Sequence, residues 1–132
     1  MPKTILCPES LKFQPRPTYP YSPGTKGEGM IFTAGQVAWD ETGEVVGIGD
    51  VAEQTRQTLK NVVSVLEKGG ACIDDVLKCN VYLADIRDFQ IMNKEFAKVF
   101  HTDPPARTTV EARLADPKML VEIEAIAYVK SD

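Results

Sequence analysis

Apolar residues recur at helical spacing in two segments of this 132-residue chain. In the first segment, Asp50 and Glu53 form a capping arrangement, and Gly69-Gly70 ends the segment because glycine tolerates a left-handed cap. Its predicted inner face consists of Val51, Thr55, Leu59, Val62, Val63 and Leu66. The second helix is predicted to begin near Asp85, with Phe89, Met92, Phe96, Val99 and Phe100 on its inner face. The spacing therefore predicts two amphipathic helices whose aromatic residues and methionine belong to the core.

Alternation with a period of two predicts strands in the remaining segments. Gly35 breaks or bulges the strand at Met30–Thr33, and a further strand pair is predicted to turn at Asp40–Gly43 and to resume at Glu44–Val46. The other predicted strands lie at 3–6, 77–83, 107–112 and 121–129. A run with Pro15, Pro17, Pro20 and Pro23 is predicted to be an ordered surface loop, because proline cannot supply the hydrogen bonds of a central strand.

The last two strands differ in the character of their faces. Arg107, Thr109 and Glu111 share one face of the strand 107–112. In the strand 121–129, one face carries Val121, Ile123, Ala125, Ala127 and Val129, and the other carries Glu122, Glu124, Ile126 and Tyr128. The order strand–strand–helix–strand–helix–strand–strand predicts an α+β fold with both helices on one face of the sheet. Two helices cover one face only, so the mixed other face points to burial against another subunit.

Composition narrows the class of protein. With 43% hydrophobic and 26% charged residues, the chain is predicted to form a single globular domain over 1–132. A net charge of −4 disfavours nucleic acid and anionic membranes as partners. Neither a membrane span nor a secretory signal is seen. The odd number of cysteines does not suggest a disulfide framework, so a reducing cytoplasm is the expected location. Cys7, Cys72 and Cys79 have no metal-ligand spacing, and His101 is predicted to be a solvated helix-end residue, so we expect no metal site.

Arg107 and Glu122 are the candidate chemical groups. The guanidinium of Arg107 matches a carboxylate, and Glu122 is a group that can hold or activate a water, which together indicate a site for an anionic ligand that reacts with water. A structural ion pair of Arg107 with Glu111 or Glu122 explains the same residues. Tyr21 is equally well explained as an anchor of the proline-rich loop, and Gly35 by backbone geometry.

Five motifs in order resemble the reactive-intermediate deaminase family, the YjgF/YER057c/UK114 group. They are P-Y-S-P-G at 20–24, M-I-F-T-A-G-Q at 30–36, Q-T-R-Q-T-L-K-N-V at 54–62, P-A-R-T-T-V at 105–110 and V-E-I-E-A-I-A at 121–127. The resemblance covers nearly the whole chain. It implies a mixed sheet with two helices on its outer face, similar to the chorismate mutase of bacilli, and a homotrimer with ligand sites between subunits.

The same resemblance implies a cofactor-free hydrolase of the 2-iminobutanoate/2-iminopropanoate deaminase type. Such enzymes convert enamines and imines such as 2-aminoacrylate or 2-aminocrotonate into 2-keto acids and ammonia. Arg107 then binds the substrate carboxylate, Glu122 matches the water-positioning glutamate, and Tyr21 lines the site. Ala34, Gly35 and Thr109 fall at substrate-binding positions. Ala34 stands where many members have serine, and Thr109 where many have cysteine, which leaves substrate preference open.

Three functions are compatible with these residues. The first is a deaminase of small 2-imino acids, including a specialised catabolic deaminase of an aminomuconate- or aminoacrylate-type intermediate. The second is a noncatalytic, regulatory protein that binds a 2-keto acid through the same arginine. The third is the RNA cleavage or translation inhibition reported for some relatives, which the acidic balance and the lack of an aromatic and basic stripe disfavour.

Overall fold

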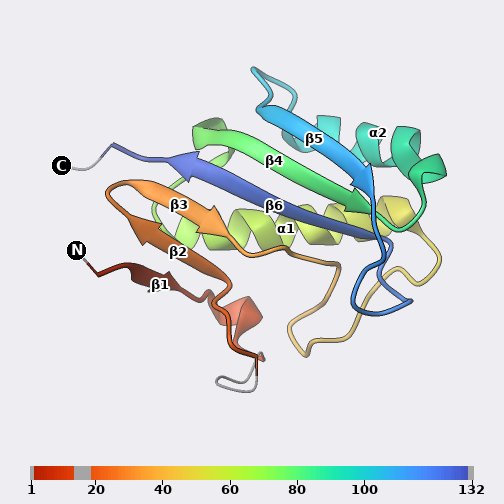
Figure 1. Cartoon of the computed structure of the whole chain (residues 1–132), viewed down its shortest axis with the longest axis horizontal. Helices are drawn as coiled ribbons and strands as arrows, with labels where there is room; N and C mark the ends of the chain where they lie inside the picture. The colour runs from red at the N-terminus through yellow and green to blue at the C-terminus, as the bar shows by residue number, and fades with distance from the viewer. Residues whose placement is uncertain (1, 14–18, 131–132) are drawn as a thin grey trace.

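Both predicted helices are present in the computed structural model of the chain, which describes residues 2–13 and 19–130. Helix α1 spans Val51–Lys68 and helix α2 spans Phe89–Val99 (Figure 1). The Asp50 carboxylate accepts a hydrogen bond from the Glu53 N–H at 3.1 Å. Gly70 has a φ of +85°, so the predicted cap and stop of α1 are confirmed.

The start of the second helix is four residues later than predicted. Asp85 caps a 3₁₀ turn at Ile86–Asp88 by accepting a hydrogen bond from the Arg87 N–H at 2.9 Å. Helix α2 begins only at Phe89, and Phe100 is its C-cap. Two further 3₁₀ turns, η1 and η2, lie at Glu9–Leu11 and Ile73–Asp75.

Six strands form one mixed sheet in the order β1-β2-β3-β6-β4-β5. Their bounds are β1 Thr4–Leu6, β2 Gly24–Gly27, β3 Met30–Thr33, β4 Val76–Leu83, β5 Ala106–Glu111 and β6 Val121–Tyr128. Strands β4 and β5 are parallel and joined through α2, whereas every other pair is antiparallel. Strand β5 is therefore an edge strand, next to β4 alone.

Two strand predictions were wrong. Strand β2 was missed because Gly-Thr-Lys-Gly has no apolar alternation; it is held by pairing with β1 and β3, and a turn at Glu28-Gly29 with φ values of 52° and 83° closes the hairpin. The expected strand pair around Asp40–Gly43 is only a turn with a single bridge between Trp39 and Val45. Of the proline-rich run, Pro15 and Pro17 lie outside the described residues.

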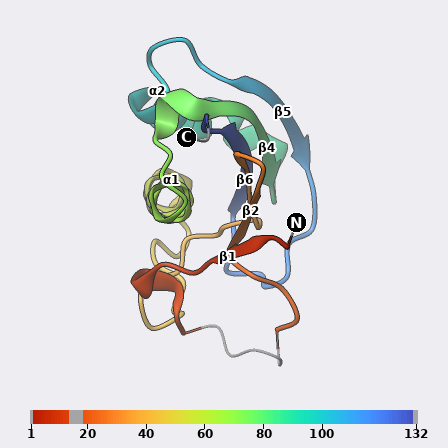
Figure 2. The same cartoon turned by 90° about the vertical axis from the view of Figure 1, so that its left-hand side faces the viewer.

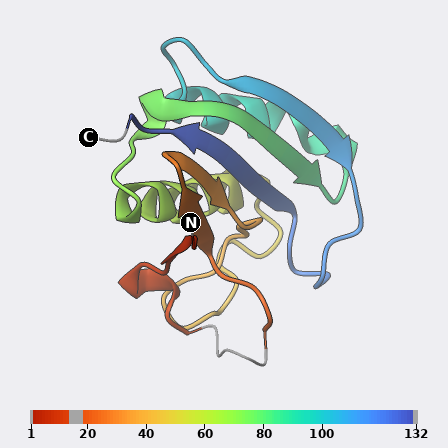
Figure 3. The ribbon, with the colours of Figure 1, turned by 60° about the vertical axis from the view of Figure 1, so that its left-hand side comes forward.

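The helices cover one face of the sheet and leave the other bare. Figure 2 shows α1 and α2 on the same side, and Figure 3 shows the sheet from the opposite side. The core lies between sheet and helices, where Val81, Ile123 and Leu59 are almost fully buried. On the uncovered face, Phe32 and Tyr128 are 48% and 45% exposed. The predicted α+β fold with both helices on one face is confirmed.

Candidate functional site

Arg107 lies on the helix side of the edge strand β5. It is in register with Cys79 of β4, whose side chain is completely buried under the helices. Neighbouring residues that are in register across two strands project from the same face of a sheet. Arg107 therefore points toward α2, and Thr109 shares that face through its pairing with Val81. The Thr109 hydroxyl is buried and has no partner among the described residues.

The side chains of α2 hold the Arg107 guanidinium. Nη2 donates a 2.7 Å hydrogen bond to Asn93 Oδ1, and the guanidinium carbon lies 4.8 Å from the ring centre of Phe96 and 5.6 Å from that of Phe89. Both rings lie at the distance of a cation–π contact. Burial lowers the pKa of Arg107 from its usual value, although an arginine remains protonated at neutral pH.

The ion-pair explanation of Arg107 is wrong. Glu111 instead accepts a hydrogen bond from the Ile86 N–H at 2.9 Å. Within the described part of the chain, no carboxylate lies at ion-pair distance from Arg107. The contacts to Asn93 and to the sulfur of Met92 leave other N–H groups of the guanidinium available for a ligand.

Cys79, the neighbour of Arg107 on β4, has an unreactive thiol. Burial raises the pKa of its thiol to about 12, outweighing the opposite effects of the Arg107 and Lys78 charges. The nucleophilic form of cysteine is the thiolate, so this thiol is inert at neutral pH.

Glu122 lies on the uncovered face of the sheet, beside Gly35. A Cβ at position 35 would lie 2.8 Å from Glu122 Cδ, closer than real side-chain contacts allow. The φ of Gly35 is not among the positive values, so space rather than backbone conformation explains this glycine. The earlier interpretation through backbone geometry was wrong. Burial, and secondly the charge of Glu124, raise the pKa of Glu122 above its usual value.

A cavity of about 860 Å³ opens beside the Glu122 carboxylate. Tyr21, Ala34 and Gly35 line it together with Glu122, so four of the sequence-predicted site residues meet here. Three further aromatic residues, Phe13, Tyr19 and Trp39, also line the cavity. The rest of its wall consists of Val37, Thr42, Gly43, Ala115, Asp116 and Met119.

One chain does not bring Arg107 and Glu122 together. In β4, Cys79 pairs with Arg107 and Tyr82 pairs with Glu122. Residues three apart on a strand project from opposite faces, so the arginine points to the helix side and the glutamate to the uncovered side. Within the described chain, the two candidate groups therefore lie on opposite faces of the sheet.

Glu124 forms a polar cluster next to Glu122. Its carboxylate accepts hydrogen bonds from the Tyr82 hydroxyl at 3.2 Å and from the Asn80 amide at 3.3 Å. The negative charge raises the pKa of Tyr82, after the larger effect of burial. Glu124 is thus fixed on the same face of β6 as Glu122.

Sequence reasoning missed the residues that hold Arg107. Phe89 and Phe96 were assigned to the core alone, and Asn93 was not considered because nothing in the helical period distinguishes it. The cue was its position on α2, one residue after the inner-face Met92. Among the described residues, no cluster of His, Cys, Asp and Glu has the arrangement of a metal site. None of the described helices is long and apolar enough to cross a membrane.

Residues 12–129 match the family described as Endoribonuclease L-PSP. The chain belongs to this family. One relative in it, a RutC family protein of Pyrococcus abyssi, is 44% identical over 97% of this chain and 98% of its own length. Another, the 3-aminoacrylate deaminase RutC of Acinetobacter baylyi, is 36% identical over 98% of this chain and 100% of its own.

Solved structures of the family have the same fold. A Mycobacterium tuberculosis member of the YjgF/YER057c/UK114 family has a TM-score of 0.82 and 29% identity, covering 97% of this chain and 100% of its own. Escherichia coli TdcF, solved with bound serine, has a TM-score of 0.78 and 31% identity, covering 84% of this chain and 89% of its own. The family resemblance drawn from the sequence is confirmed.

Proposed function

We propose that this protein hydrolyses small 2-imino acids and their enamine tautomers to 2-keto acids and ammonia. The observation that carries the proposal is the state of Arg107. Its guanidinium is fixed by Asn93 and two aromatic rings, yet no described carboxylate pairs with it. A desolvated arginine in this state favours a carboxylate ligand. The relatives support the reaction class, since one is a 3-aminoacrylate deaminase and another was solved with bound serine.

The reacting site needs two copies of the chain. Arg107 and Glu122 project from opposite faces of one sheet, so a ligand that touches both lies between one subunit's α2 side and its partner's uncovered face. The exposed Phe32 and Tyr128 on that face gain burial in such an assembly. We infer a homotrimer with one site at each subunit interface.

The proposed chemistry requires no covalent intermediate with the protein. The enamine takes a proton at carbon to become an iminium, whose carboxylate is bound by Arg107. Glu122 accepts a proton from a water as its oxygen bonds to the iminium carbon. Glu122 returns this proton to the carbinolamine nitrogen and is ionised again. The hydroxyl then loses its proton to water as the carbonyl forms, the C–N bond breaks, and ammonia leaves with the 2-keto acid. A glutamate with a raised pKa suits this exchange of protons near neutral pH.

RNA cleavage is less well supported despite the family's description. The cavity beside Glu122 also has Asp116 in its wall. Two carboxylates repel the phosphates of RNA, and the net charge of −4 gives no general attraction.

The test generates 2-aminoacrylate and 2-aminocrotonate in place with a serine/threonine dehydratase and follows keto-acid release. We expect the protein to accelerate release over spontaneous hydrolysis. Arg107→Ala and Glu122→Gln should each reduce kcat/KM by about 100-fold or more. The first variant no longer positions the substrate carboxylate, and the second lacks the base that accepts a proton from water. Arg113→Ala, which removes an exposed arginine just beyond β5, is the matched control and should retain activity.

A stability measurement and a binding measurement distinguish a loss of catalysis from a loss of folding or of ligand binding. Glu122→Gln should unfold at the same or a higher temperature, because a raised pKa means that burial disfavours the ionised carboxylate at neutral pH. If the wild-type protein binds 2-keto acids but gives no acceleration, the deaminase proposal is wrong and the noncatalytic binder explains the site.

A further inference from the structure

The cavity beside Glu122 is larger than the smallest imino acids need. Pockets for drug-sized ligands span about 300–1,000 Å³, and about 860 Å³ is near the top of that range. In contrast, 2-aminoacrylate has only about six non-hydrogen atoms, far fewer than such ligands. Ala34 and Gly35 carry minimal side chains on this wall and keep the approach to Glu122 open.

Four aromatic side chains line this space. Phe13 and Trp39 pack edge to face with ring centres 5.2 Å apart, and Tyr19 and Tyr21 do so at 6.5 Å. Met119 adds a flexible apolar side chain, and Val37 and Ala115 add smaller apolar ones. An apolar ligand group placed here removes both its own surface and that of the rings from water, which is favourable.

Polar side chains of α1 fix the main chain of this wall. The buried Asn61 donates from Nδ2 to the carbonyls of Val37 and Trp39, both at 3.0 Å, and Gln57 also donates to the Trp39 carbonyl at 3.1 Å. Gln54 donates to the Lys118 carbonyl at 2.8 Å. A wall anchored in this way is a preformed pocket, which favours selectivity for shape.

Charge restricts what else the cavity accepts. Glu122 and Asp116 both line it, and Asp116 Oδ1 is already held by the Lys118 N–H at 2.8 Å. A ligand with a second carboxylate in this space brings like charges together in a partly desolvated site, which is unfavourable. The iminium group, which is positive, is attracted instead.

From these observations, and resting on the proposed function, we propose that this cavity receives the substrate's side chain. It selects 2-imino acids with branched or aromatic apolar side chains over the methyl-bearing one and over those with a second carboxylate. Met119 and Trp39 are the residues that set this preference.

The first experiment measures binding without chemistry. Trp39 is the single tryptophan of the chain and lies in the cavity wall, so its fluorescence reports occupancy directly. The assembled protein is titrated with 4-methyl-2-oxopentanoate, pyruvate and 2-oxoglutarate. We expect the branched keto acid to bind at least about tenfold more tightly than either of the others.

The second experiment measures hydrolysis. D-amino acid oxidase generates the imino acids of alanine, leucine and phenylalanine, and D-aspartate oxidase that of glutamate. We expect kcat/KM to be at least about tenfold higher for the leucine and phenylalanine imines. Met119→Trp fills the cavity and should lower kcat/KM for the leucine and phenylalanine imines to the level of the alanine imine or below it. Met119→Leu conserves volume and should retain the preference.

The results distinguish the two proposals. Equal or better binding and hydrolysis of the methyl-bearing or acidic compounds by the wild-type protein overturns the cavity assignment but leaves the deaminase proposal intact. Preferential binding of the branched keto acid without hydrolysis of any imine supports the cavity assignment and removes the deaminase proposal. If Met119→Trp fails to fold, the wild-type comparisons alone decide the question.

Discussion

Two carboxylates lie two residues apart on the same face of β6, and the surroundings give them different roles. Glu124 is tied to Tyr82 and Asn80 by hydrogen bonds. Glu122 faces the cavity and receives no hydrogen bond from the described residues, and its pKa is raised. The fixed charge of Glu124 makes Glu122 more basic than burial alone does. Under the proposed function, Glu124 therefore tunes the proton affinity of its neighbour.

Glu124→Gln should shift the pH dependence of imine hydrolysis. The Glu124 charge raises the pKa of Glu122, so its removal lowers that pKa and moves the acid limb of the kcat profile to lower pH. Glu67→Gln changes the same charge at an exposed position on α1 and should leave the profile unmoved. A profile that is identical for the wild-type protein and Glu124→Gln would contradict this coupling.

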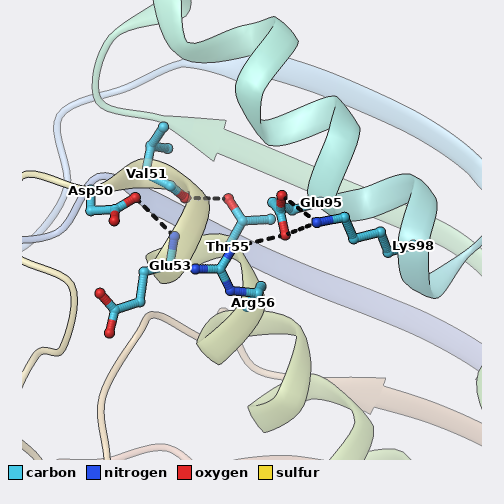
Figure 4. A network of polar contacts seen from close by, with 7 residues as sticks. All are labelled: Asp50, Val51, Glu53, Thr55, Arg56, Glu95 and Lys98. Atoms are coloured by element: carbon cyan, nitrogen blue, oxygen red, sulfur yellow. Dashed lines mark hydrogen bonds and ion pairs between the residues drawn. The ribbon is translucent and has the colours of Figure 1, made fainter.

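Helix packing positions Arg107, because α2 carries the groups that hold it. A polar network joins the two helices (Figure 4). Glu95, which is 7% exposed, accepts hydrogen bonds from Arg56 of α1 at 3.0 Å and from Lys98 at 2.9 Å. The hydrogen bonds from Lys98, then from Arg56, lower the pKa of Glu95. This network fixes α2 against α1 two residues from Asn93.

Glu95→Gln should lower the melting temperature near neutral pH by about 3–5 °C, which corresponds to about 1 kcal/mol because both cationic partners are half exposed. A lowered folded-state pKa means that this stabilisation exists above the unfolded value near 4.5 and is lost as the pH falls through the folded value. The melting temperatures of the wild-type protein and of Glu95→Gln should therefore differ at neutral pH and converge at about pH 3. A constant difference at both pH values would contradict an ionic origin.

The helices and the long strands could be predicted from the sequence because each has a clear apolar period. Strand β2 and the Trp39–Val45 turn lack one, since partner strands and the side chain of Asn61 fix them. Glu122 could be assigned to a face because Val121 and Ile123 mark the buried side. The strand around Arg107 has no apolar face, so the sequence alone does not show from which face of the sheet the Arg107 side chain projects. Only the pairing of β5 with β4 decides this. Tyr21 was found by resemblance alone.

At the scale of the whole molecule, the structure is one subunit of the proposed homotrimer. The face without helices carries Glu122 and the exposed rings of Phe32 and Tyr128, whereas the helix face carries Arg107. Because a closed ring brings different faces of neighbouring subunits together, a trimer repeats the same composite site at each interface.

Mixing inactive variants should restore activity. Arg107→Ala and Glu122→Gln chains are unfolded together and refolded as mixed trimers. About a quarter of the interfaces then combine an intact arginine with an intact glutamate, so we expect about a quarter of the wild-type rate. Co-refolding Arg107→Ala with itself is the control. Recovery no greater than in that control, or a stable monomer by solution mass, would contradict the composite site.

Gly35 has a consequence for how this protein can lose its activity. Any larger residue there meets the Glu122 side chain, which is a flexible group that can move aside, whereas the backbone of position 35 accepts ordinary residues. A Gly35→Ala change, which a single nucleotide substitution makes, therefore leaves fold and assembly intact but displaces the carboxylate. Under the proposed function, a single substitution at this position is thus enough to give a stable, catalytically inactive protein whose Arg107 still binds carboxylates.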